Sequence, residues 1–235
     1  MMKSICICCR GNSLKYIKNV PKVDSYLLVN DFSGEIEISD VKETLTGSNI
    51  YHLFNNWNYM YDIPRMVNKN FYTEFNVKKI VSAYLKDTSS NSKYSIVGRD
   101  GEIPFEWYPE ELKEYMWTQD KNKFANLKAN AKYKWDFPSC GNGAALYGAY
   151  HATDEIHIIG MDFYTDLDNC YASGEVMRDL GHGSNEMKDF LIEQTFLKFP
   201  NKKFYMYVTS DFDYNLDNVS VIRVGKEDLQ WWENK

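Results

Sequence analysis

The chain has 235 residues, 44% of them hydrophobic, and a formal net charge of -6. This length fits a single domain over 1–235 with a sizeable core, and the negative charge supplies no basic surface, so a nucleic-acid partner is not expected. No apolar run approaches the roughly 20 residues of a membrane span, and Met1–Cys6 has no signal-peptide pattern, which predicts a cytoplasmic protein without a transmembrane segment.

Apolar runs without alternation predict strands that are buried on both faces of a parallel sheet. In chain order they are Ser4–Cys9, Ser25–Val29, Ile50–Phe54, Tyr94–Val97, Ile156–Ile159, Lys203–Val208 and Val219–Val224. Helical segments are predicted between these strands, at Pro64–Leu85, Pro109–Ala131 and Ser184–Phe199. The alternation predicts an α/β fold with a Rossmann-like doubly wound, mostly parallel sheet.

The stretch Ser139–Tyr164 predicts a ligand site within this sheet. Its segment Gly141–Gly143 indicates a glycine-rich turn before a small-residue helix, and its strand Ile156–Ile159 ends at the polar residues that follow Gly160. Ligands of α/β folds lie where strands end and helices begin, and a helix N-terminus offers free N–H groups to an anion. The stretch therefore predicts a site for a phosphorylated ligand.

The residue types that bind metals form no recognisable site. The five cysteines have no zinc spacing, and their odd number argues against a disulfide framework. Cys6, Cys8 and Cys9 are expected to be buried in the core. Asp211 and Asp213 follow a strand and have the chemistry to chelate a cation, but a solvated turn is the favoured interpretation, so no metal is expected.

His182 is the candidate general base, because it lies between two glycines just before an amphipathic helix. From the residues alone, a loop histidine without a catalytic role is the favoured interpretation. The remaining histidines are expected to be structural: His52, His151 and His157. Tyr164 and Tyr171 bracket an acidic loop, and their hydroxyls can stabilise a departing phosphate without a metal, although the residues alone favour ordinary aromatic packing.

Several short blocks appear in the order known from one family of enzymes. They are Gly11–Lys15 after the first strand, strand ends at Asn30 and Asn55, Ser139-Cys140-Gly141, Gly160–Tyr164, Tyr171 and Gly181–Ser184. Together they resemble the bacterial sialyltransferases of glycosyltransferase family 42, over nearly the whole chain. The resemblance implies a Rossmann-like sheet with a small lid, with lid elements within 100–135 and 165–182. It also implies an inverting, metal-independent transfer of sialic acid or a related sugar from a CMP-sugar donor to a glycan or other acceptor hydroxyl.

The resemblance also assigns roles to residues. His182 would deprotonate the acceptor, and Tyr164 and Tyr171 would hydrogen-bond the leaving phosphate. The implied donor-binding residues are Gly11, Asn12, Ser13, Asn30, Asn55, Ser139, Cys140, Gly141 and Asp162. No cofactor is expected beyond the nucleotide-sugar substrate, and a homo-oligomer is compatible with the sequence.

Two departures from the family pattern bear on the donor. Cys9–Ser13 stands where the family has Gly-Asn-Gly-Pro-Ser, and Cys140 replaces a serine that touches the donor. These changes affect the identity of the sugar more than the type of reaction. One alternative is a transferase of the same fold that uses another nucleotide sugar, or an acceptor such as a modified DNA base. The other is a sugar-nucleotide-binding protein without catalysis.

Overall fold

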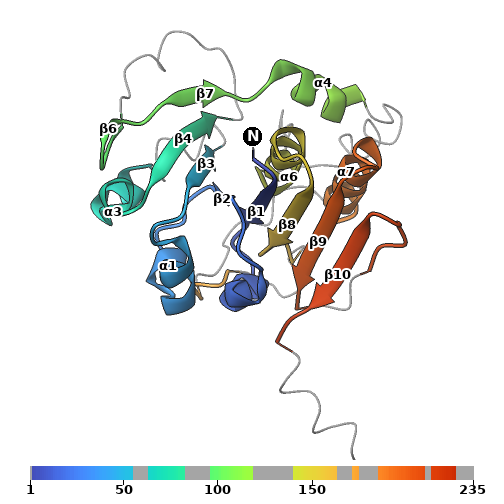
Figure 1. Cartoon of the computed structure of the whole chain (residues 1–235), viewed down its shortest axis with the longest axis horizontal. Coiled ribbons are helices and arrows are strands. Elements are labelled where there is room, and N and C mark those ends of the chain that lie inside the picture. The colour runs from blue at the N-terminus through green and yellow to red at the C-terminus, as the bar shows by residue number, and fades with distance from the viewer. Residues whose placement is uncertain are drawn as a thin grey trace, which may run out of the picture.

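The computed structural model describes residues 2–54, 63–82, 96–118, 140–162, 171–174, 185–209 and 213–225. These residues form an eight-stranded sheet in the order β10-β9-β8-β1-β2-β3-β4-β7 (Figure 1), and every neighbouring pair is parallel. Its strands are β1 (Ser4–Cys8), β2 (Ser25–Val29), β3 (Ile50–Phe54), β4 (Val77–Ser82), β7 (Phe105–Trp107), β8 (Glu155–Ile159), β9 (Lys203–Val208) and β10 (Val219–Arg223). The prediction of an α/β fold with a Rossmann-like, mostly parallel sheet is confirmed.

The order of the strands reverses beside β1. The chain proceeds from β1 through β2, β3, β4 and β7 to one edge, and then returns to β8, β9 and β10 on the other side. β1 pairs in register with both neighbours, since Ile5 lies opposite Ser25 of β2 and Ile156 of β8. In open α/β sheets, ligands bind at this switch point, beyond the carboxyl ends of the strands. The fold therefore places a candidate site after β1 and β8.

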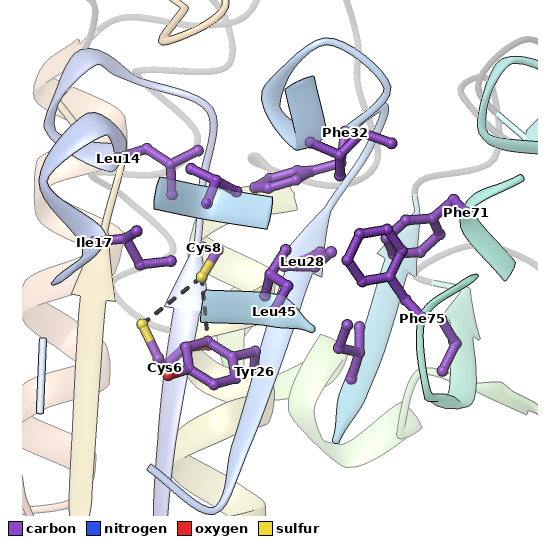
Figure 2. Packing of buried hydrophobic residues seen from close by; sticks show 14 of the residues in the cluster. Cys6, Cys8, Leu14, Ile17, Tyr26, Leu28, Phe32, Leu45, Phe71 and Phe75 are labelled. Carbon is purple, nitrogen blue, oxygen red and sulfur yellow. Dashed lines mark hydrogen bonds between the residues drawn. The ribbon is translucent and has the colours of Figure 1, made fainter. Parts of the chain in front are cut away.

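Helices cover both faces of the sheet. The helical elements are η1 (Asn12–Asn19), η2 (Glu35–Glu37), α1 (Ser39–Leu45), α3 (Phe71–Glu74), α4 (Glu110–Thr118), α6 (Cys140–His151) and α7 (Asn185–Lys198). Side chains of α4, α6 and α7 pack in the cluster that contains Ile5 and Ile7 of β1. Those of η1, α1 and α3 pack with Cys6 and Cys8 (Figure 2). Because successive strand residues point to opposite faces, one strand supplies both cores.

The cysteines of the first strand are buried, as predicted. Cys6 and Cys8 are fully buried beside Leu14 and Ile17 of η1, and their sulfur atoms lie 3.7 Å apart (Figure 2). On the other face, α6 packs closely on the sheet, because a Cβ atom added at Gly148 would lie 2.5 Å from Cδ1 of Ile7. The small residues of α6 permit this close approach.

The elements differ from the prediction at four places. The segment Pro64–Leu85 is not helical throughout, since 63–68 and α3 are helical but β4 follows as a strand of the main sheet. Two lysines interrupt the apolar run of β4 and hid its character. The short strand β7 was not predicted. Of the predicted strand Tyr94–Val97, the described part reaches only into β5 (Val97–Gly98), which pairs with β6 (Gly101–Glu102) in a separate antiparallel hairpin.

The fourth correction concerns Gly141–Gly143, which was predicted to be a turn. These residues lie in the first turn of α6, where the carbonyl oxygen of Gly143 accepts a hydrogen bond from the Tyr108 hydroxyl at 2.9 Å. The glycines here are part of the helix and do not reverse the chain. Among the described residues, no helix is long and apolar enough to cross a membrane.

The segments predicted to form a lid are described only in part. In 100–135 the structure contains β7 and α4, and Leu112 and Met116 of α4 are buried in the core. The hydroxyl of Tyr115 donates to the carbonyl of Gln194 in α7 at 2.9 Å, which ties α4 to that helix. In 165–182 only 171–174 belongs to the described residues.

Candidate functional site

The loop after β1 lies directly against the loop after β8. The amide of Cys9 donates to Ile159 O and that of Gly11 donates to Gly160 O, both at 2.8 Å. Gly160 has φ +76°, and an added Cβ would lie 2.1 Å from Cys9 O. A Cβ at Gly11 would lie 2.4 Å from the Asp162 carboxylate. Both positions require glycine, because any side chain would push the two loops apart.

Asp162 joins the ends of three strands. One carboxylate oxygen, Oδ2, accepts hydrogen bonds from the Ser13 amide at 2.8 Å and the Ser13 hydroxyl at 2.9 Å. The other, Oδ1, accepts from the amide and hydroxyl of Thr209 after β9, both at 3.3 Å. The Ser13 hydroxyl in turn accepts from the Gly160 amide at 2.8 Å. Ser13 and Asp162, both predicted to bind the donor, are buried and hold the loops of the site together.

Asn30 occupies the turn after β2, as the sequence predicts. Its φ of 60° is left-handed, a conformation that asparagine tolerates better than most residues. Its amide donates to Leu53 O at 2.9 Å, which fixes the turn against β3. Its side-chain oxygen Oδ1 is buried without a hydrogen-bond partner among the described residues. An unsatisfied buried oxygen costs about 1–3 kcal/mol, which makes Asn30 Oδ1 a candidate acceptor for a hydrogen bond from a ligand.

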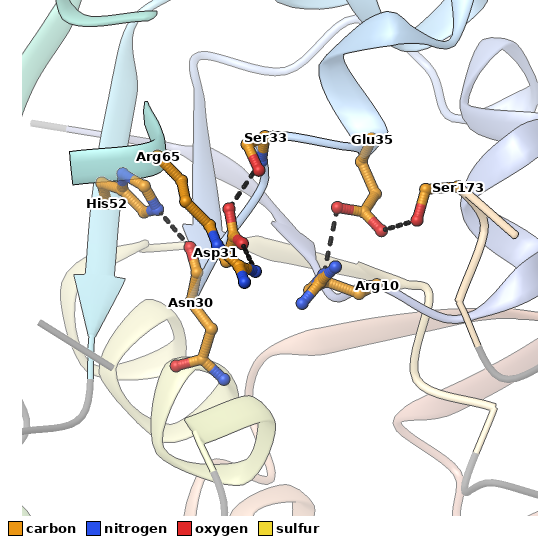
Figure 3. A network of polar contacts seen from close by, with 8 residues as sticks. All are labelled: Arg10, Asn30, Asp31, Ser33, Glu35, His52, Arg65 and Ser173. Carbon is orange, nitrogen blue, oxygen red and sulfur yellow. Dashed lines mark hydrogen bonds and ion pairs between the residues drawn. The ribbon is translucent and has the colours of Figure 1, made fainter. Parts of the chain in front are cut away.

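His52 supports Asn30 from behind (Figure 3). Nε2 of His52 lies 2.7 Å from the Asn30 carbonyl oxygen, and Nδ1 lies 3.2 Å from the Tyr72 hydroxyl. A carbonyl can only accept, so Nε2 carries the proton and Nδ1 accepts from Tyr72. Burial lowers the pKa of His52 to about 4, although the hydrogen bond to Asn30 and the charge of Asp31 favour the protonated ring. The ring is therefore neutral near pH 7. The prediction that His52 is structural is confirmed.

His157 is likewise a core residue, as predicted. It is buried in β8, stacks on Tyr205 with ring centroids 4.8 Å apart, and lies 3.1 Å from the Tyr207 hydroxyl through Nδ1. Burial lowers its pKa, with Glu155 opposing the change. His151 ends α6 at the opposite end of the sheet from the candidate site, and burial lowers its pKa as well.

Arg10 and Glu35 form an ion pair that the sequence did not reveal. Arg10 Nε lies 3.0 Å from Glu35 Oε2, and the Glu35 side chain is 0% exposed (Figure 3). A second pair joins Arg65 to Asp31 at 3.0 Å, next to Asn30 in the chain. Glu35 lies in a segment with other acidic residues, Asp31, Glu37 and Asp40. Nothing local distinguishes Glu35 as a buried ion-pair partner, so it could not be identified before Arg10 was placed.

Tyr171 and Cys140 are two further predicted site residues that the structure describes. The guanidinium carbon of Arg10 lies 4.1 Å from the centroid of the Tyr171 ring. Cys140 is buried at the start of α6 and belongs to the same core cluster as Cys9. Burial raises the pKa of the Cys9 thiol, and Cys8, Asp162 and Cys140 raise it further, so this thiol is not ionised near neutral pH.

Four predicted site residues lie outside the described residues. They are Asn55, Ser139, Tyr164 and His182. The structure brings Gly11, Ser13 and Asp162 together. It also places Tyr171 beside Arg10, which belongs to the loop after β1. Within the described ranges, no group of three or more His, Cys, Asp or Glu side chains is arranged to hold a metal ion.

Comparison with known proteins gives a clear result only at the level of structure. No family model and no curated protein sequence matches the chain. The sialyltransferase CstII in complex with a trisaccharide acceptor and CMP matches with a TM-score of 0.55 and 13% identity, over 99% of this chain and 100% of that chain. The chain has the fold of a sialyltransferase.

Two further solved structures agree with this result. CstII from Campylobacter jejuni in complex with cytidine-5'-monophosphate has a TM-score of 0.51 and 14% identity, covering 100% of this chain and 99% of that chain. The complex with CMP-3FNeuAc has a TM-score of 0.51 and 15% identity, covering 100% of both chains. The resemblance expected from the short sequence blocks is therefore confirmed for the fold, along the full length.

Proposed function

We propose that this protein is a sialyltransferase-like glycosyltransferase that moves a sugar from a CMP-sugar to an acceptor hydroxyl. The observation that carries the proposal is the full-length likeness to CstII structures that contain CMP. The carboxyl-end loops of β1, β2 and β8 support it, because they form a site at the switch point of the sheet. The inverting course and the independence from metal are part of the proposal.

The proposed step needs one base and one stabilised leaving group. His182 takes the proton of the acceptor hydroxyl, whose oxygen attacks the anomeric carbon of the donor sugar as the bond to the phosphate oxygen breaks. CMP leaves with that electron pair, and attack opposite to it inverts the configuration. Tyr164 and Tyr171 donate hydrogen bonds to the leaving phosphate, which relieves its developing charge without a cation. Asn30 Oδ1 accepts a hydrogen bond from a donor group of the nucleotide sugar.

Nucleotide selectivity tests this proposal directly. Thermal unfolding is followed with CMP, UDP and GDP at matched concentrations, since a ligand at 100 times its Kd stabilises the fold by about 2.7 kcal/mol. We expect a clear upward shift of Tm with CMP and none with UDP or GDP. A shift with UDP and none with CMP would reject the CMP-sugar donor and favour the transferase that uses another nucleotide sugar. This second candidate has support from the altered loop at Arg10 and from Cys140.

A pair of substitutions at Asn30 separates its side chain from its backbone. Asn30→Gly preserves the left-handed turn, because glycine adopts a positive φ freely, but it removes the buried Oδ1. We expect CMP or donor affinity to fall about tenfold, as one lost hydrogen bond implies, with little change in stability. Asn30→Ala removes the same atom and also strains the turn. Unchanged donor affinity in Asn30→Gly contradicts the role of this side chain.

His182→Ala separates binding from turnover. We expect loss of transfer by about 10²–10⁴-fold with CMP binding retained, because the base acts on the acceptor and not on the nucleotide. His151→Ala is the matched control, since His151 lies at the other end of α6 from the site. Transfer at the normal rate by His182→Ala would remove the base assignment and leave the donor-binding proposal intact.

A further inference from the structure

A short segment at 171–174 is held against the loop after β1 by several contacts. The amide of Ala172 donates to the Arg10 carbonyl oxygen at 2.7 Å, and the Arg10 guanidinium lies over the Tyr171 ring at 4.1 Å. Ser173 extends the contact, because its hydroxyl donates to Glu35 Oε1 at 2.9 Å. These bonds join positions that are more than 135 residues apart in the chain. The segment is fixed through both its backbone and its side chains.

Glu35 closes this arrangement from the side of η2 (Figure 3). Its second oxygen accepts from Arg10 Nε at 3.0 Å, so one carboxylate bridges the arginine and Ser173. Burial raises the pKa of Glu35, while Arg10 and Ser173 act in the opposite direction. The backbone just before η2 also packs tightly here, since a Cβ at Gly34 would lie 2.9 Å from Ser173 Cβ. Arg10 is thus held in one orientation by a carboxylate that is itself fully buried.

The position of a tyrosine hydroxyl follows from its Cα and its ring plane. Arg10 constrains the Cα and the ring of Tyr171. The Arg10 carbonyl anchors Ala172, the residue after Tyr171, and the planar Arg10 guanidinium lies over the face of the Tyr171 ring. A hydrogen-bond donor to a leaving group is effective only when its oxygen is placed before the reaction begins. Arg10 is also one of the residues by which this loop departs from the family pattern.

We propose that Arg10, braced by Glu35, is a positioning residue that presents the Tyr171 hydroxyl to the leaving phosphate. The inference rests on the proposed function for the identity of the leaving group. The clamp itself, Arg10 with Glu35 and 171–174, is a property of the fold that can be measured without turnover.

A double-mutant cycle of Arg10→Met and Tyr171→Phe tests the catalytic part. Met keeps the unbranched stem and loses the guanidinium, while Phe keeps the ring and loses only the hydroxyl. We expect Arg10→Met to lower kcat about tenfold or more with the donor KM within about threefold, because a misplaced group acts on the transition state. In the Tyr171→Phe background, the same change should lower kcat by less than about threefold. Arg10→Lys should recover part of the loss.

Two results overturn this part. An equal loss of kcat in both backgrounds shows that Arg10 supports the fold in general and does not act through the Tyr171 hydroxyl. A rise in donor KM with unchanged kcat shows that Arg10 contacts the donor itself. If Arg10→Met does not fold, Glu35→Gln enters the same cycle, since it keeps the shape of Glu35 and removes the charge that orients Arg10.

Hydrogen–deuterium exchange tests the clamp independently of activity. Peptides covering 171–174 should exchange faster in Arg10→Met or Glu35→Gln than in the wild type. Lys69→Met is the matched control, because it breaks a 2.8 Å ion pair with Glu37 whose side chains are both about half exposed. Unchanged exchange in both clamp variants overturns the inference even in an active enzyme. A wild type that transfers no sugar rejects the proposed function, while the exchange result still decides whether the clamp exists.

Discussion

Stability should fall in mildly acidic solution because of His52. This side chain is fully buried, and both ring nitrogens are engaged, with Nε2 donating to the Asn30 carbonyl and Nδ1 accepting from Tyr72. Protonation would turn Nδ1 into a second donor facing a hydroxyl and would place a charge in an apolar layer beside Phe54 and Phe71. The folded protein therefore resists the proton that the unfolded chain accepts.

The size of the effect follows from the pKa difference. Burial lowers the pKa of His52 from its ordinary 6.5 to about 4 in the folded state. Between these two values the unfolded chain binds more protons than the folded one, so the free energy of unfolding decreases as the pH falls through this window. At about 1.36 kcal/mol for each pKa unit, the loss from this residue is roughly 2 kcal/mol at pH 5 and about 3 kcal/mol at pH 4. Above about pH 7.5 the residue contributes almost no pH dependence, because its ring is then unprotonated in both the folded and the unfolded chain.

Urea unfolding of the wild type and His52→Gln at several pH values between 7.5 and 4 measures this contribution. Gln retains an N–H donor for the Asn30 carbonyl and does not titrate, while all other ionisable groups are common to both proteins. We expect the wild-type free energy of unfolding to drop by about 3 kcal/mol more than that of His52→Gln over this range. Parallel pH curves for the two proteins would refute the assignment of a depressed pKa to His52.

Two further predictions concern the loops of the site. Gly160→Ala should cost about 3 kcal/mol or more in urea unfolding, because strain at φ +76° adds to a clash with Cys9 O, whereas Gly47→Ala has a similar φ of +74° with open space and should cost about 1 kcal/mol. Equal losses of unfolding free energy in the two variants would show that backbone strain alone, without the clash at Cys9 O, determines the cost of Gly160→Ala. Asp162→Asn should destabilise by about 2 kcal/mol and weaken CMP binding, since one amide N–H₂ group must face the donors of Ser13 or Thr209. Wild-type stability and CMP affinity in this variant contradict the anchoring role.

The strands that were predicted correctly have a local signal. β2, β3 and β9 match the predicted bounds, and β1, β8 and β10 agree within about one residue at one end. The central strands β1, β2, β3 and β8 are mostly apolar runs buried on both faces, whereas the side chains of β10, at the edge of the sheet, are half-buried or exposed. β4 was missed because Lys78 and Lys79 break its pattern, and these side chains are the exposed or partly exposed ones of that strand. The glycines of 141–143 were interpreted as a turn from their composition, but they form the first turn of α6, where the Gly143 carbonyl accepts a hydrogen bond from Tyr108, a residue from another part of the chain.

The residues of the candidate site likewise divide into those with a local sequence signal and those without one. Asn30 and Gly11 were predicted because a polar residue or glycine directly after a buried strand is a local pattern in α/β sheets. The ion pair of Arg10 with Glu35 and the support of Asn30 by His52 join residues 25 and 22 positions apart, with no periodicity to reveal them. Their pairing became visible only when strand order was known.

By itself, the sequence determined the class of the fold, most strands of its sheet and the loops where a ligand site lies, since apolar runs and strand-end residues are local features. The tertiary structure alone decided which side chains are available in that site. In the folded protein, Ser13 and Asp162 are hydrogen-bonded to each other and anchor the loops, and the Arg10 guanidinium lies over the Tyr171 ring. Asn30 Oδ1 is buried without a hydrogen-bond partner among the described residues. These outcomes depend on the parallel register of β8, β1 and β2, which brings distant loops to one edge of the sheet.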